Sequence, residues 1–294
     1  MLGTHLLGLY EKALPASFSW EQRLKAAKQL GFDYVELSID ETDERLARLD
    51  WSASEAEALR RLCAELGVGL QSMCLSAHRR FPFGSADPEK RARAHDIMQK
   101  ALTLSSRLGI RVIQLAGYDV YYEESTPTSR RLFREGMAWS AKQAERQQIM
   151  LAMEIMDTPF LNSISKHMAY EAMLQSPWYR VYPDLGNISA WPENDVDFEL
   201  RRGVSSIVAV HLKDTLAVTD SFAGKFKCVP FGAGCVDFVR RFAQLEQLGY
   251  TGPYMIEMWH DESAPDALSP VREAKAWIEA QFARGMEEHE CWKS

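Results

Sequence analysis

Four ionisable residues in the second half of the chain stand near the ends of short apolar runs. The runs are LAMEIMD, VYPDLGN, VAVHLKD and MIEMW, and they carry Glu154, Asp184, His211 and Glu257. A charge buried in such a run is costly unless it is paired or bound to a metal. Three carboxylates and one imidazole on successive runs predict a site for one divalent cation, and Mn²⁺, Zn²⁺, Mg²⁺ and Co²⁺ all suit these ligands. An internal network of salt bridges is the alternative, but three acids and one histidine leave surplus negative charge.

Further polar residues stand at the ends of earlier runs and are candidates for substrate contact. Tyr10, Glu36 and His78 belong to this group. Tyr10 and Glu36 fit a structural role equally well, since an acid or a tyrosine at such a position often caps a helix or pairs with a lysine. His78 is the stronger candidate for contact with a substrate.

A glycine-rich segment from Gly224 to Gly234 precedes a predicted helix and contains Lys225 and Lys227. Backbone N–H groups at glycines and at a helix N-terminus bind phosphate in many proteins. The segment is therefore a candidate phosphate cradle, although a solvated loop with incidental lysines would look similar.

The elements that must position these residues alternate between strands and helices. Leu-Gly pairs end helical patterns at Gly31, Gly67, Gly109 and Gly249, as expected for glycine after the last helical turn. Apolar and β-branched runs predict eight strands: His5–Tyr10, Tyr34–Ile39, Gly69–Ser76, Arg111–Tyr118, Ile149–Met156, Tyr179–Gly186, Ile207–Asp214 and Pro253–Trp259. Amphipathic stretches of helical length separate them, which predicts a parallel sheet.

Eight such units in 294 residues predict a single (β/α)8 barrel, with an open doubly wound sheet as the alternative. We expect one domain over residues 1–294, of which 285–294 form a C-terminal tail. In a barrel of this kind the active site lies at the C-terminal ends of the strands. The four ionisable residues would therefore meet at one mouth.

Composition narrows the possible partners. A net charge of −7 and the lack of a basic run argue against nucleic acid. No apolar stretch approaches the roughly 20 residues that span a bilayer, and the first residues lack the features of a signal peptide, so we expect a cytoplasmic protein without a membrane partner. Five cysteines without a CxxC spacing argue against a disulfide framework and a thiolate metal site.

Several segments resemble the L-ribulose-5-phosphate 3-epimerases, also named L-xylulose-5-phosphate 3-epimerases. They are YEKALP, SIDETDERLARLDW, SMCLSAHRRFPFGS, IRVIQLAGYDVYY, AMEIMDTPFLNSISK and PFGAGCVDF, and the resemblance runs from about Leu7 to Trp277. It implies a xylose-isomerase-like TIM barrel. In that family the equivalents of the four ionisable residues bind a metal, and the two glutamates exchange protons with the sugar.

The resemblance also implies a reaction, the interconversion of L-ribulose 5-phosphate and L-xylulose 5-phosphate. Removal and return of a proton at C3 through a cis-enediolate would invert that centre, in pentose and L-ascorbate catabolism. Asn187 stands where related ketose 3-epimerases have a histidine, and Ala233 where a glutamate is frequent. We expect Asn187 and Lys213 to contact the pentulose phosphate substrate, and we expect the protein to be a homodimer.

Three other functions are compatible with parts of the pattern. An aldose–ketose isomerase, or an epimerase of a different ketose or ketose phosphate, would use the same metal and glutamates. An abasic-site DNA endonuclease would need more metal-binding histidines and a basic face, whereas this chain has seven histidines and a net charge of −7. A sugar-phosphate-binding protein would bind the metal without turnover.

Overall fold

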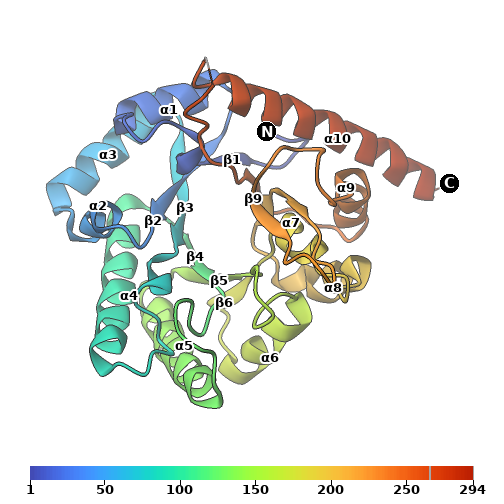
Figure 1. Cartoon of the computed structure of the whole chain (residues 1–294). Coiled ribbons are helices and arrows are strands. Elements are labelled where there is room, and N and C mark those ends of the chain that lie inside the picture. Colours follow the sequence, from blue (N-terminus) through green and yellow to red (C-terminus); the bar gives the residue numbers. More distant parts are fainter. Residues whose placement is uncertain (265, 294) are drawn as a thin grey trace.

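Eight parallel strands form a barrel that is surrounded by helices (Figure 1). The computed structural model describes residues 1–264 and 266–293. The barrel strands are β1 (Leu7–Tyr10), β2 (Tyr34–Ile39), β3 (Gly69–Leu75), β4 (Val112–Ala116), β5 (Met150–Glu154), β6 (Tyr179–Tyr182), β7 (Val210–Leu212) and β10 (Tyr254–Ile256). Their order is β6-β5-β4-β3-β2-β1-β10-β7. Two isolated parallel bridges, Val181 with Ile207 and Asp184 with His211, close the ring between β6 and β7. The predicted barrel is confirmed.

Helices follow the strands and begin and end where local chemistry predicts. They are α1 (Trp20–Gln29), α2 (Asp43–Leu46), α3 (Ala53–Leu66), α4 (Pro88–Leu108), α5 (Pro127–Gln147), α6 (Ile164–Leu174), α7 (Leu185–Ser189), α8 (Val196–Gly203), α9 (Phe238–Gln247) and α10 (Ser269–Lys293). Ser52 and Glu55 form a capping box at the start of α3, and Gly67 ends it with a φ of 69°. The other three Leu-Gly glycines also have positive φ, as predicted.

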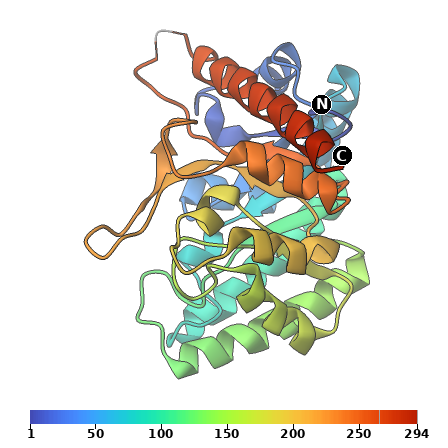
Figure 2. The same cartoon turned by 90° about the vertical axis from the view of Figure 1, so that its right-hand side faces the viewer.

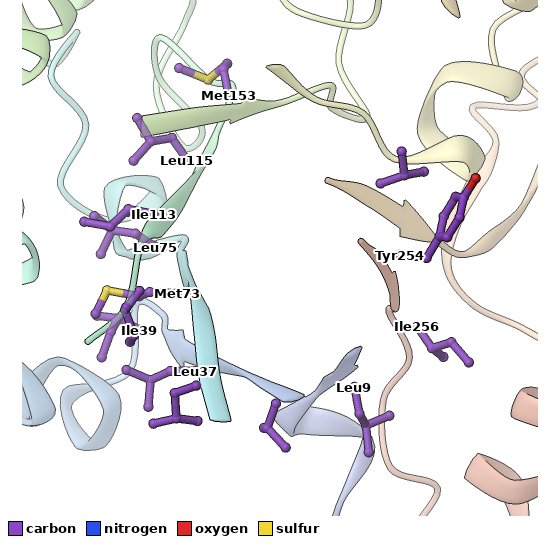
Figure 3. Packing of buried hydrophobic residues seen from close by; sticks show 14 of the residues in the cluster. Leu9, Leu37, Ile39, Met73, Leu75, Ile113, Leu115, Met153, Tyr254 and Ile256 are labelled. Atoms are coloured by element: carbon purple, nitrogen blue, oxygen red, sulfur yellow. The ribbon is translucent and has the colours of Figure 1, made fainter. Parts of the chain in front are cut away.

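The main apolar core lies between the strands and the helices. Leu9, Leu37, Ile113 and Met153 belong to it and are almost completely buried. In Figure 3 their side chains lie on the outer side of the ring of strands, towards the helices. Successive residues of a strand point to opposite faces, so the residues between them face the inside of the barrel.

The inside of the barrel is buried but lined by polar side chains. Glu36, Ser38, Ser72 and Gln114 occupy alternate positions of β2, β3 and β4, and each is 0–4 % exposed. Gly8 in β1 leaves space for the aromatic ring of Tyr34, because a Cβ atom at position 8 would lie 2.3 Å from that ring. The hydrophobic layer outside the strands therefore stabilises the fold, while the interior is free to carry polar groups.

A hairpin interrupts the pattern after β7 and was not predicted. β8 (Asp214–Leu216) pairs antiparallel with β9 (Lys225–Val229), so the segment that we expected to be a loop begins as a strand. Figure 2 shows this hairpin, in orange, extending beyond the end of the barrel.

The C-terminal part of the chain is helical. Residues 285–293, part of the expected tail, continue α10, and position 294 lies outside the described residues. α10 packs on α9 across the outside of the barrel (Figure 1). Across residues 1–264 and 266–293, none of the helices is both long enough and apolar enough to span a membrane.

Candidate active site

The four ionisable residues that the sequence singled out meet at the C-terminal ends of four strands. Glu154 is the last residue of β5, His211 lies in β7, and Glu257 directly follows β10. Asp184 follows β6 and caps the N-terminus of α7 by accepting a hydrogen bond from the backbone N–H of Asn187, at 2.7 Å. One potential ligand atom from each of the four lies within 4.8 Å of the others, and all four residues are buried.

The imidazole of His211 is held between two carboxylates. Its Nδ1 atom lies 3.1 Å from Oε1 of Glu154 and 3.9 Å from one carboxylate oxygen each of Asp184 and Glu257. Its Nε2 atom lies 3.3 Å from Oε1 of Glu36. Nδ1 therefore faces the other three candidate ligands, and Glu36 orients the imidazole from the opposite side.

Lys213 contributes a positive charge beside the candidate metal ligands. Its Nζ atom lies 2.8 Å from Oε2 of Glu257 and 3.3 Å from Oδ2 of Asp184. Burial alone would raise the pKa of Glu257, but the charges of Lys213 and His211 outweigh it and lower this pKa to about 2. Part of the alternative salt-bridge network is thus present beside the candidate metal ligands.

The remaining charges of the group bear on whether it could hold a cation. Burial, together with the neighbouring carboxylates, raises the pKa of Asp184 to about 7, and burial also raises the pKa of Glu154. Burial would lower the pKa of His211, but Glu36 and Glu154 raise it well above its usual value. Oδ2 of Asp184 accepts no hydrogen bond, although Nζ of Lys213 lies 3.3 Å from it. Hard oxygen ligands and one imidazole fit a divalent metal ion.

Like Lys213, two further predicted substrate-contact residues, Tyr10 and Lys227, lie at this mouth. Tyr10 donates or accepts a hydrogen bond with Oγ of Ser38, at 3.0 Å, and its ring meets the edge of Trp259. Trp259 also lies beneath two ammonium groups, with Nζ of Lys213 at 5.9 Å and Nζ of Lys227 at 5.6 Å from the ring centre. Lys227 on β9 therefore reaches back towards the site.

Other predicted contact residues are placed differently. Glu36 lies inside the barrel on the far side of His211 and accepts a hydrogen bond from Ser72, at 2.5 Å. Lys225 is exposed on β9 and makes no ion pair or ring contact within the described part of the chain. Their roles in binding substrate stay predictions.

His78 and Asn187 are also engaged by the protein. Nε2 of His78 lies 3.1 Å from the carbonyl oxygen of Ala94 in α4, and its ring packs on Phe83. The structure thus does not bring His78 into the group of four, and burial lowers its pKa to about 4. Asn187 donates from its side chain to the carbonyl oxygen of Ile155, at 2.8 Å, whereas its own Oδ1 is buried without a donor.

The glycine-rich segment after β9 binds a carboxylate of its own chain. The backbone N–H groups of Gly232 and Gly234 each donate to Oδ2 of Asp214, at 2.9 Å, and that of Val236 donates to Oδ1. Asp214 is 1 % exposed. A phosphate at these amides would have to displace this carboxylate, so the expected cradle is already occupied.

Sequence reasoning missed several residues around the site. Gln114 on β4 donates a hydrogen bond to Glu154, and it stands as a lone polar residue at an inward position of the run VIQLA. That alternation was the signal that could have revealed it. Trp259 and Asp214 carried no comparable signal, because their contacts involve segments distant in the sequence.

Comparison with known proteins agrees with this fold. The family model of the xylose isomerase-like TIM barrel matches residues 24–281. L-Ribulose-5-phosphate 3-epimerase UlaE of Escherichia coli is 55% identical over 278 residues, which cover 95% of both chains.

Solved structures share the fold at low sequence identity. The structure of an L-ribulose 3-epimerase has a TM-score of 0.77 at 20% identity and covers 98% of each chain. A xylose isomerase-like TIM barrel protein from Mycobacterium smegmatis in complex with magnesium has a TM-score of 0.69 at 17% identity, covering 97% of this chain and 98% of its own. With the match over 278 residues at 55% identity, the chain belongs to the L-ribulose-5-phosphate 3-epimerases of the xylose isomerase-like TIM barrel family.

Proposed function

We propose that this protein interconverts L-ribulose 5-phosphate and L-xylulose 5-phosphate by inverting C3. The observation that carries the proposal is the convergence of Glu154, Asp184, His211 and Glu257 at one barrel mouth, in a chain 55% identical to L-ribulose-5-phosphate 3-epimerases. Epimerisation next to a carbonyl needs a base on each face of the carbon. The site offers two glutamates from separate strands.

The four residues would hold one divalent cation. Three carboxylates and an imidazole match the preferences of Mn²⁺, Mg²⁺, Zn²⁺ and Co²⁺, and a related protein of the same fold is known in complex with magnesium. When bound, the cation would supply positive charge opposite the negative charge that develops on the C2 and C3 oxygens of the sugar. Asp184 and His211 would mainly serve as ligands, since Asp184 is fixed by its helix cap and His211 by Glu36.

Glu154 and Glu257 would move the proton. One carboxylate takes the proton from C3, the electron pair of the C–H bond forms the C2–C3 double bond, and the electron pair of the C2 carbonyl π bond moves onto the C2 oxygen to give the enediolate. The other glutamate, as a carboxylic acid, returns a proton to C3 from the opposite face. Gln114 orients Glu154, and Lys213 orients Glu257, so each of the two bases has its own partner.

A coupled assay with purified protein tests this function directly. L-Ribulose 5-phosphate should be converted into L-xylulose 5-phosphate and the reverse, and both conversions should stop when the metal is removed. Turnover of an unphosphorylated ketose with equal efficiency would instead favour an epimerase of free sugars. Metal binding without turnover of either pentulose phosphate would reduce the proposal to a binding protein.

We further propose that the chain acts as one domain and forms a homodimer. One cluster of buried apolar residues contains members from Leu2 to Phe282, which supports a one-domain structure. Light scattering coupled to size-exclusion chromatography measures the mass in solution. A mass of one chain would contradict the homodimer.

A further inference from the structure

A buried carboxylate without a counterion lies just beyond the end of β7. Asp214 begins β8, directly after Lys213, and is 1 % exposed. Among the described residues, no lysine or arginine forms an ion pair with this carboxylate. Backbone N–H groups satisfy it instead, since Oδ2 accepts from Gly232 and Gly234, each at 2.9 Å, and Oδ1 accepts from Thr215 at 3.0 Å. Charge-assisted hydrogen bonds are among the strongest in proteins, so these contacts fix the backbone at Asp214.

The glycine-rich segment is shaped around this carboxylate. A Cβ atom at position 234 would lie 2.0 Å from Oδ1 of Asp214, so a larger residue there would displace the carboxylate. Gly232 has a φ of 86°, which glycine adopts without strain. Gly232 also lies against the indole of Trp277 in α10, because its Cβ atom would be 3.0 Å from that ring. The segment therefore contacts both Asp214 and the long helix α10.

The backbone on either side of Lys213 is held as well. Before it, Leu212 belongs to the barrel, and its carbonyl oxygen accepts a hydrogen bond from the backbone N–H of Glu257, at 3.0 Å. After it, the hydroxyl of Thr215 donates to the carbonyl oxygen of Gly186 in α7, at 2.8 Å. A Cβ atom at position 186 would lie 2.6 Å from the carbonyl oxygen of Lys213, so the two backbones pack closely. Lys213 is thus the junction between the barrel and a fixed segment.

The side chain of Lys213 depends on this fixation. Its Nζ atom lies 2.8 Å from Oε2 of Glu257 and 3.3 Å from Oδ2 of Asp184, and the residue is 6 % exposed. A lysine carries its charge on a flexible stem, so the position of the ammonium group follows the position of the backbone. A displacement of about 1 Å near reacting groups can lower a rate by roughly 100-fold.

We infer that Asp214 is a positioning residue: together with the glycine-rich segment it fixes the backbone at Lys213 and so places the ammonium group against Glu257. The inference rests on the proposed function, in which Glu257 is one of the two bases. It assigns a task to a buried carboxylate that is not among the candidate metal ligands. The amides of Gly232 and Gly234 then serve the active site indirectly, by holding Asp214.

Two substitutions disturb this contact from opposite sides. Asp214→Asn turns an N–H donor towards the backbone N–H groups that Asp214 binds, and Gly234→Ala places a methyl group against Oδ1 of Asp214. Each should lower kcat for L-ribulose 5-phosphate roughly 10- to 100-fold and change KM less than about threefold, because Glu257 loses a correctly placed partner while the substrate still binds.

Asp237→Ala is the matched control, because it destabilises the same segment without touching Asp214. Asp237 caps α9 by accepting a hydrogen bond from the backbone N–H of Arg240, at 3.1 Å. Its loss should lower the melting temperature, whereas kcat should stay within about twofold of the wild type.

A Lys213→Met background shows whether Asp214 acts through Lys213. In that background Asp214→Asn should lower the remaining rate less than about threefold, because the side chain that it positions is gone. An equal loss of kcat in both backgrounds, or wild-type kcat in Asp214→Asn, would overturn the inference.

Chemical labelling tests the placement of Lys213 without turnover. An amine-reactive ester is added to the metal-loaded protein, and peptide mass spectrometry measures the rate at which Lys213 is modified. This rate should rise roughly fivefold or more in Asp214→Asn and Gly234→Ala, because the segment opens locally, and stay unchanged in Asp237→Ala. Labelling as slow as in the wild type in both variants would refute the positioning role. Failure of the wild type to convert either pentulose phosphate would instead reject the proposed function, and the labelling rates would still decide whether Asp214 fixes Lys213.

Discussion

Oε1 of Glu36 lies 3.3 Å from Nε2 of His211, on the side of the ring opposite the other three candidate ligands. Ser72 and Tyr182 hold the second oxygen of Glu36, with hydroxyl distances of 2.5 and 3.4 Å. A carboxylate behind a metal-binding histidine fixes the ring and increases its basicity. Glu36 should therefore act on metal binding through His211.

Glu36→Gln should weaken metal binding by roughly 10- to 100-fold, because the amide keeps the shape but loses the charge behind the imidazole. Equilibrium dialysis with Mn²⁺ measures the change. Glu246→Gln is the matched control, since Glu246 pairs with His5 at 2.6 Å, remote from the site. Unchanged metal affinity in Glu36→Gln would show that Glu36 has only a structural role.

Removing the metal should abolish epimerisation and lower the melting temperature. The emptied site leaves three buried carboxylates close together, and a ligand that binds only the folded state stabilises it. Asp184→Asn is a useful variant for comparison, because asparagine still caps a helix but carries no charge. Added metal should raise the melting temperature of the wild type and have little effect on this variant. Full activity in thoroughly demetallated protein would contradict the metal-dependent mechanism.

Glu154→Gln and Glu257→Gln should each lose orders of magnitude in epimerisation. If each glutamate serves one face of C3, one variant should still exchange the C3 proton of a given epimer with solvent, whereas the other should not. Deuterium uptake at C3 in heavy water, starting from each pentulose phosphate, measures this. Metal content must be checked in both variants, because both glutamates are also candidate ligands. Wild-type inversion in variants that keep their metal would refute the assignment of two bases.

His78 should make the protein less stable in acid. Its pKa is about 4 when folded, against an ordinary value near 6.5, because burial disfavours the charged ring. Below pH 6.5 the unfolded chain therefore gains a proton that the folded chain lacks, and the free energy of unfolding falls until about pH 4. This residue should contribute about 3 kcal/mol of that loss.

His78→Gln should flatten the stability curve between pH 6.5 and 4 and leave a constant difference from the wild type above pH 7. Urea unfolding at a series of pH values measures both curves. A constant difference over the whole range would show that the ring already titrates at its ordinary pKa.

The barrel and its candidate ligands could be predicted from sequence because both leave local signals. Each strand is a short apolar run, each Leu-Gly pair ends a helix, and each candidate ligand is a lone charge near the end of a run. The interior position of Glu36 follows from the same alternation, although its contact with His211 joins strands that are 175 residues apart in the sequence.

Contacts between distant segments left no such signal. The Gly232 and Gly234 amides suggested a phosphate cradle, and only the folded chain shows that Asp214 fills it. His78 looked like a contact residue because it follows a strand, but a single turn of 3-10 helix directs its ring towards α4. The direction of a side chain after a strand depends on loop geometry, which residue types alone do not determine.

The closure of the barrel between β6 and β7 rests on few backbone contacts. Val208 N donates to Val181 O at 3.1 Å and His211 N donates to Pro183 O at 3.0 Å, and Asp184 and His211 face each other across this seam. An ion bound by these two side chains would link β6 to β7 and so stabilise the closed barrel. Slow amide hydrogen exchange at His211 in the metal-loaded protein, and fast exchange after chelation, would show this effect. The cation would then stabilise the closed barrel as well as take part in the reaction.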